Sequence, residues 1–259
     1  MNNNPIGLYD SGFGGLSVWR ELHRALPNES LVYLGDGKNC PYGSLDEATI
    51  RSYATQSVQL LLDKGCKLIV VACNTATAAA ISHLRATFPQ VPIVGLEPAI
   101  KPACLSTRSG VVGVIATERS LKGEKFLSTL ARYGEGVKVI KVVGEGFVEA
   151  VEANKESDAS TEQQVRAVVE PIISAGADMI VLGCTHYPFL RGVIERVVGE
   201  RGICVIDSGE AVEKRVESLL DEHGLRASAD NIPQMEFLTF ADEEYRERLR
   251  RKAFEDTIY

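Results

Sequence analysis

The chain has 259 residues, enough for one large α/β domain or two domains of ordinary size. It carries 28 lysines and arginines against 35 aspartates and glutamates, for a net charge of −7. This balance argues against general binding to nucleic acid or to an anionic membrane, because both need a basic face. The N-terminal MNNNPIGLYDSG lacks the features of a signal peptide and no apolar run is long enough to span a membrane, so we expect a cytoplasmic protein.

Short apolar runs alternate with amphipathic segments along the chain, which is typical of βα units that build a mainly parallel sheet. Strands are expected at residues 6–9, 31–35, 68–72, 92–95, 111–115, 137–143, 179–183 and 203–206. Between them, residues 46–64 and 162–175 place their apolar side chains on one helical face, and each segment ends at a glycine. The fold class is therefore α/β.

The expected strands form two groups of four with similar spacing. Each strand of the second group starts 105 to 111 residues after its counterpart in the first. We therefore predict two similar doubly wound α/β lobes related by a pseudo-two-fold, with the active site in the cleft between them. Residues 1–96 and 208–259 would form the first lobe, and residues 97–207 the second. The strand-like EFLTF at 236–240 and the charged helix after it would return to the first lobe.

In each group the third strand ends at a cysteine: Cys73 in ACNTAT for the first group and Cys184 in GCTHYP for the second. Ligands of doubly wound sheets bind at this end of the strands. A thiol pKa of about 8.5 allows one cysteine to be a thiolate while the other keeps its proton near neutrality. Two such thiols can remove a proton from one face of a carbon and return one to the other. The remaining cysteines, at positions 40, 66, 104 and 204, are expected to be buried free thiols without chemistry.

Cofactor and metal motifs are not apparent in the sequence. GFGG at residues 12–15 does not match the dinucleotide fingerprint, and we identify no lysine motif for pyridoxal phosphate. There is no CxxC pair, and the spacing of Cys184 and His186 disfavours a metal site. We therefore expect neither a cofactor nor a metal.

Four motifs in chain order resemble the signature of glutamate racemase, a cofactor-independent family of the aspartate/glutamate racemase superfamily. They are DSGFGGLSV (10–18), PYG (41–43), ACNTAT (72–77) and GCTHYPFL (183–190), and the resemblance covers nearly the whole chain. It implies reversible interconversion of L- and D-glutamate, which supplies D-glutamate for peptidoglycan. It also implies that Cys73 and Cys184 are the two acid/base thiols, with Cys73 serving D-glutamate and Cys184 L-glutamate.

The same resemblance gives roles to residues near the two thiols. Asp10 would assist Cys73, and His186 would assist Cys184. Glu152 aligns with a glutamate that the family places near the second cysteine, although Gly144-Glu145 departs from the family's usual Cys-Pro, and Glu149 is a near neighbour. Substrate contacts would come from Asp10, Ser11, Tyr42, Gly43, Asn74, Thr75, Thr185 and His186.

Other readings of these residues remain open at this stage. Asp10 or Ser11 could instead cap the helix expected near Gly14, since short polar side chains are favoured there. The whole chain could be an aspartate or hydantoin racemase, or an isomerase with a cysteine nucleophile. A non-catalytic two-lobed amino-acid-binding protein is the alternative from another class, although such a protein needs no matched thiols. A homodimer is compatible with the sequence, which does not fix the oligomeric state.

Overall fold

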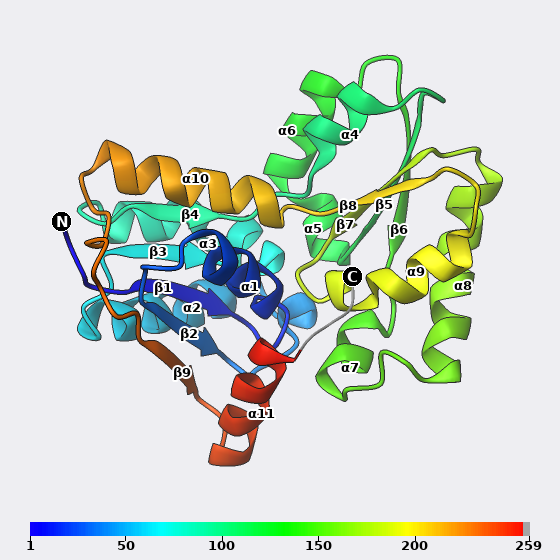
Figure 1. The fold of residues 1–259 in the computed structure, drawn as a ribbon. Helices are drawn as coiled ribbons and strands as arrows, with labels where there is room; N and C mark the ends of the chain where they lie inside the picture. The colour runs from blue at the N-terminus through cyan, green and yellow to red at the C-terminus, as the bar shows by residue number, and fades with distance from the viewer. Residues whose placement is uncertain (256–259) are drawn as a thin grey trace. The chain divides into compact units, whose positions relative to one another are not determined.

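The computed structural model describes residues 1–255, and contacts within the chain divide it into two compact units (Figure 1). Of the described residues, unit 1 comprises 1–96 and 209–255, and unit 2 comprises 97–208. Residues 256–259, which the sequence analysis assigns to the first lobe, lie outside the described residues. Among residues 1–255, no helix has the length and apolar character needed to cross a membrane.

Unit 1 is built on a five-stranded parallel sheet. Its strands lie in the order β4 (Ile93–Gly95), β3 (Leu68–Val71), β1 (Ile6–Asp10), β2 (Leu31–Gly35) and β9 (Met235–Thr239). Every residue of β1, β2 and β3 is buried. Strands covered on both faces read as continuous apolar runs, which is why these segments are visible in the sequence.

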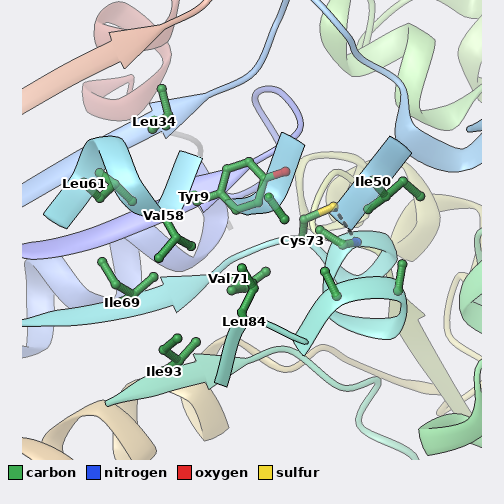
Figure 2. Close-up of a cluster of buried hydrophobic side chains, with 14 of the residues drawn as sticks. Tyr9, Leu34, Ile50, Val58, Leu61, Ile69, Val71, Cys73, Leu84 and Ile93 are labelled. Carbon is green, nitrogen blue, oxygen red and sulfur yellow. Dashed lines mark hydrogen bonds between the residues drawn. The ribbon is translucent and has the colours of Figure 1, made fainter. Parts of the chain in front are cut away.

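The helices of unit 1 follow the strands in βα order. They are α1 (Leu16–Ala25), the 3-10 helix η1 (Tyr42–Ser44), α2 (Glu47–Asp63), α3 (Asn74–Thr87), α10 (Gly209–Glu222) and α11 (Glu243–Phe254). Helix α2 contacts α3, whereas α1 contacts α10 and α11. Apolar residues of α2, α3 and the central strands form one buried cluster, which includes Tyr9 and Cys73 (Figure 2). Cys73 therefore belongs to the packed core of unit 1.

Unit 2 contains a four-stranded parallel sheet in the order β6 (Lys138–Val143), β5 (Val111–Ala116), β7 (Met179–Gly183) and β8 (Cys204–Ile206). Its helices are α4 (Ile100–Ser106), α5 (Glu118–Lys122), α6 (Glu124–Tyr133), α7 (Phe147–Glu152), α8 (Ala159–Ser174), the 3-10 helix η2 (Tyr187–Leu190) and α9 (Arg191–Val198). Helix α4 contacts α6, and α8 contacts α9. As in unit 1, a buried strand, β7, leads directly into the segment that carries a thiol.

The two units share one strand order. In unit 1 the first four strands lie as β4-β3-β1-β2, and their counterparts in unit 2 lie as β8-β7-β5-β6. The predicted strands agree with the observed ones to within one residue at each end, so the prediction of two similar α/β lobes is confirmed at the level of topology. Strand β9 is the addition: it pairs with β2 and brings the C-terminal segment into unit 1.

Asp178 closes the end of β7 that lies away from Cys184. Its carboxylate accepts hydrogen bonds from the backbone N–H groups of Arg108 and Ser109 and from the hydroxyls of Thr107 and Ser109. Burial alone raises the pKa of Asp178, but these hydrogen bonds outweigh it and lower the pKa to about 2. The group therefore stabilises the loop before β5 as a carboxylate.

Candidate active site

Cys73 stands between β3 and α3, at the N-cap position of the helix. Its sulfur accepts a hydrogen bond from the backbone N–H of Ala76 at 3.4 Å, marked by the dashed line in Figure 2. N–H groups in the first turn of a helix have no intrahelical partner and carry a partial positive charge, so they favour a thiolate over a thiol. The fold thus places Cys73 where its ionised form is stabilised.

The structure brings Ser11 to Cys73, with 3.6 Å between Oγ and Sγ. Asp10, its neighbour at the end of β1, is fully buried, and its Oδ1 accepts the backbone N–H of Gly12 at 2.7 Å. The alternative that either residue caps the next helix is wrong. Helix α1 has Gly15 at its N-cap and no side-chain cap, because the glycine-rich turn separates Asp10 and Ser11 from the helix start.

Asn74 and Thr75 occupy the first turn of α3, and both are buried. Asn74 is only 3% exposed, yet its amide Nδ2 has no hydrogen-bond partner among the residues that the structure describes. A buried donor without an acceptor is costly and rare in folded proteins, and it commonly marks a place that a ligand or water fills. The amide beside Cys73 is therefore a candidate contact for a substrate oxygen.

Tyr42 and Gly43 are adjacent in η1 but differ in burial. The Tyr42 side chain is buried, whereas Gly43 is exposed. The Tyr42 hydroxyl donates to Oδ2 of Asp36 at 2.6 Å and accepts from the hydroxyl of Tyr9 at 2.7 Å. Burial raises the pKa of Tyr42 and of Tyr9, so both phenols keep their protons. A substrate contact by this turn would come from its main chain.

Tyr9 and Asp36 belong to this arrangement although the sequence analysis did not select them. Asp36 is fully buried, and its carboxylate also accepts the amide of Asn39. Their sequence positions indicate a site only weakly: Tyr9 directly precedes Asp10, and Asp36 directly follows β2. Both positions suit ordinary core and turn residues equally well.

Cys184 directly follows β7, and a histidine and a glutamate stand behind it. Its sulfur lies 3.8 Å from Nδ1 of His186, and Nε2 of His186 lies 2.7 Å from Oε1 of Glu152. An ionised carboxylate only accepts hydrogen bonds, so Nε2 carries the ring proton. In the neutral ring Nδ1 then faces the thiol as an acceptor, the arrangement by which a general base activates a nucleophile or acid/base thiol.

Helix α7 supplies Glu152 and is held close to the thiol segment by Tyr187. The Tyr187 hydroxyl donates to the carbonyl of Gly144 at 3.3 Å, and a Cβ at Gly144 would lie 2.6 Å from that hydroxyl. The glycine therefore leaves room for the tyrosine. Burial, followed by the nearby Cys184 and Glu149, raises the pKa of Tyr187. Glu149 thus lies near Tyr187, whereas Glu152 is the carboxylate that bonds His186.

The remaining predicted residues and thiols can be placed as follows. Thr185 is buried directly after Cys184. Cys66 and Cys104 are buried, as expected, but Cys40 is half-buried and Cys204 is exposed. The expectation for Cys204 is wrong because it opens β8, a short strand at the edge of the sheet. Within unit 1 alone and within unit 2 alone, the described residues gather no set of three metal-ligating side chains.

Two units of one topology, each with a cysteine after its third strand in sequence, define an α/β protein with two internally similar halves. The profile of the Asp/Glu/Hydantoin racemase family matches residues 10–216. The chain is 46% identical over 224 residues to a glutamate racemase of Ectopseudomonas mendocina, covering 86% of this chain and 85% of the relative.

Solved structures agree with this match. Glutamate racemase isoform RacE1 of Bacillus anthracis superposes with a TM-score of 0.86 at 32% identity, covering 97% of this chain and 94% of that one. Escherichia coli glutamate racemase, in complex with L-glutamate and the activator UDP-MurNAc-Ala, gives a TM-score of 0.83 at 32% identity over 96% and 95% of the two chains. The chain belongs to the Asp/Glu/hydantoin racemase family and is an isomerase.

Proposed function

We propose that this chain interconverts L- and D-glutamate without a cofactor. The observation that carries the proposal is the pair of thiols, each placed after the third strand of its unit. A backbone N–H that stabilises a thiolate lies beside Cys73, and an imidazole that can accept a proton lies beside Cys184. The similarity to glutamate racemases supports glutamate as the substrate. The same similarity supports a role in supplying D-glutamate for peptidoglycan.

In the proposed reaction, one thiolate removes the Cα proton of glutamate and becomes a thiol. The carbanion that remains takes a proton on its opposite face from the second thiol, which becomes a thiolate, so one proton enters and one leaves the substrate. Cys73 acts on D-glutamate and Cys184 on L-glutamate, and both must reach the Cα of one substrate molecule. Each thiol starts the cycle in the protonation state in which the other one ends it.

Different groups lie beside the two thiols. For Cys73 these are the first turn of α3, the Ser11 hydroxyl and, as the assisting carboxylate, Asp10. For Cys184, Nδ1 of His186 receives the thiol proton, and the Glu152 carboxylate stabilises the imidazolium that forms. Different neighbouring groups thus assist the two thiols in the same proton-transfer reaction.

Glutamate is held by donors at helix starts and turns, since none of the four motifs contains an arginine. We assign the unpartnered amide of Asn74 to a substrate carboxylate, together with the hydroxyls of Ser11, Thr75 and Thr185. The main chain of Tyr42 and Gly43 adds contacts from the exposed side of η1. A site with fixed donors for the γ-carboxylate leaves them unpaired with the shorter aspartate, so glutamate should be preferred.

A chiral assay tests the proposal. The purified chain is incubated with L-glutamate, D-glutamate or either enantiomer of aspartate, with a chelator present and no added cofactor. We expect racemisation of both glutamate enantiomers and a much lower kcat/KM on aspartate. Equal kcat/KM on the two acids would overturn the substrate assignment. Tight binding of glutamate without turnover would favour the alternative of a two-lobed binding protein.

Isotope incorporation tests the two-thiol mechanism. In D2O with L-glutamate as substrate, early D-glutamate should carry deuterium at Cα while residual L-glutamate remains mostly protiated. The mirror result is expected from D-glutamate. Early product that keeps the hydrogen of the substrate would mean that one base serves both faces, and the mechanism would be wrong. Cys73→Ala and Cys184→Ala should each abolish racemisation while the fold persists.

The setting of the enzyme is also a proposal. We place it in the cytoplasm, where the D-glutamate precursor of peptidoglycan is needed and where free thiols persist. We further propose a homodimer, which sedimentation velocity at micromolar concentration would test.

A further inference from the structure

A chain of buried hydrogen bonds joins β1, η1 and the loop after β2. Tyr9 donates its phenol proton to the Tyr42 oxygen at 2.7 Å, and Tyr42 donates its own proton to Asp36 at 2.6 Å. All three side chains are at most 1% exposed. Burial keeps both phenols protonated, so Tyr9 donates to the Tyr42 oxygen and Tyr42 donates to the carboxylate oxygen of Asp36.

Tyr9 also contacts the thiol segment through its main chain. Its carbonyl accepts the backbone N–H of Ala72 at 2.7 Å, one residue before Cys73. Tyr9 lies opposite Val71 of β3 in the sheet register and in the same buried cluster as Cys73 (Figure 2). One residue of β1 therefore bonds both the strand end that presents the thiol and the side chain that anchors the Tyr42–Gly43 turn.

The anchor matters because η1, which also packs against α3, is held in the core by its one buried residue, Tyr42. It is three residues long, Pro41 and Gly43 on its surface side are exposed, and only the Tyr42 side chain is buried. The phenol is bound on both sides, by Tyr9 and by Asp36, and these two bonds restrict the main chain of Tyr42 and Gly43. Preorganised donors bind a ligand more tightly because the cost of ordering them is already met in the free protein.

We propose that Tyr9 is a positioning residue for racemisation, which acts through Tyr42 to hold the Tyr42–Gly43 main chain at the distance from Cys73 that the substrate requires. The inference rests on the proposed function, since it assigns the turn to glutamate binding. Tyr9 does not transfer protons in this scheme. Its loss should therefore weaken substrate binding and leave the chemical step nearly intact.

The test is a double-mutant cycle on purified, folded protein. Tyr9→Phe removes one hydroxyl and should raise KM for both glutamate enantiomers about fivefold with kcat changed less than twofold, the effect expected for one neutral hydrogen bond. Tyr42→Phe should raise KM by at least as much, because Asp36 loses a donor too. In Tyr42→Phe the Tyr9 hydroxyl has already lost its acceptor, so adding Tyr9→Phe should change nothing further, and the double variant should have the KM of Tyr42→Phe.

Tyr53→Phe is the matched control, since its ring lies 5.9 Å from that of Tyr42 but its hydroxyl takes no part in the Tyr9–Tyr42–Asp36 hydrogen bonds. It should leave KM and kcat unchanged. Circular dichroism and thermal unfolding establish that each variant is folded at the assay temperature. Wild-type KM in folded Tyr9→Phe, or multiplicative effects in the double variant, would overturn the role of Tyr9. A wild-type chain that neither binds nor racemises glutamate would instead overturn the proposed function, and this inference with it.

Discussion

Glu152 holds His186 from the side opposite to Cys184: its Oε1 lies 2.7 Å from Nε2, while Nδ1 lies 3.8 Å from the sulfur. The carboxylate fixes which ring nitrogen is protonated, and it comes from a helix 34 residues earlier in the chain. Carboxylate, imidazole and thiol therefore form one line of interacting groups within unit 2.

The first prediction concerns the charge in this line. Glu152→Gln keeps an oxygen that can accept from Nε2–H but removes the negative charge that stabilises the imidazolium. We expect kcat/KM for glutamate to fall roughly tenfold, with the same unfolding midpoint within a few degrees. Glu149→Gln is the matched control and should stay near wild type. A larger loss in Glu149→Gln than in Glu152→Gln would reverse the assignment of the two glutamates.

The second prediction follows from the unpartnered amide of Asn74. Asn74→Ala removes a buried donor for which residues 1–255 supply no acceptor, so thermal stability should change little. If the amide binds a substrate carboxylate, kcat/KM should fall about tenfold, mostly through KM. Ser57→Ala removes another buried, unpartnered polar atom from α2 and should leave the kinetics unchanged. Unaltered KM in Asn74→Ala would remove Asn74 from the site.

The third prediction separates the thiols by reactivity. Burial, reinforced by Glu236, raises the pKa of Cys66 to about 12, so this thiol stays protonated and unreactive in the folded protein. Cys204 is exposed. With iodoacetamide at roughly pH 8, mass spectrometry of peptides should find Cys204 labelled first and Cys66 labelled only after unfolding. Labelling confined to Cys204 should leave racemisation intact, and early modification of Cys66 would contradict its burial.

The fourth prediction is a pH dependence of stability due to Asp178. Its folded pKa of about 2 lies below the ordinary value of 3.8, so the group stabilises the fold above about pH 4 and loses this contribution as the pH falls towards 2. Asp178→Asn should lower the free energy of unfolding by roughly 1 kcal/mol at neutral pH, after allowance for partial exposure, and the difference from wild type should shrink between about pH 4 and 2.

Urea unfolding across this pH range checks the effect of Asp178, with Asp221→Asn as the control. Asp221 pairs with Arg226 on the surface, where an ion pair contributes little. Racemisation by Asp178→Asn should be unaffected at neutral pH, because Asp178 and Cys184 stand at opposite ends of β7. A constant difference from wild type at every pH would show that the ionised carboxylate is not the stabilising form.

The strands and their grouping could be predicted because buried parallel strands leave continuous apolar runs, as in LVYLG at β2 and MIVLG at β7. Cys204 shows the limit of this signal: ICVI reads as buried, but its strand lies at the sheet edge and the first residue is exposed. Hydropathy reports the residue and its neighbours in sequence, whereas exposure depends on which element covers the strand.

The site was predictable only where motif residues are adjacent in sequence. Ser11 meets Cys73 across 62 residues, and Tyr9 meets Tyr42 across 33. No periodicity encodes such a contact between two side chains, because it depends on the register of β1 against β2 and β3. The turn after β1 shows the same limit, since Asp10 and Ser11 are good capping residues in sequence, but Asp10 bonds the N–H of Gly12 and neither residue caps α1.

The different surroundings of the two thiols have a consequence for the symmetry of catalysis. The enantiomers of glutamate are mirror images of equal free energy, so in the proposed reaction detailed balance requires the same kcat/KM in both directions. The two thiols have different surroundings: the first turn of a helix and a serine lie beside Cys73, whereas an imidazole with its carboxylate lies beside Cys184. The two enantiomers are therefore free to differ in KM and in kcat, provided that the two differences cancel. An analogue of D-glutamate and an analogue of L-glutamate would therefore face two thiols with different chemical surroundings.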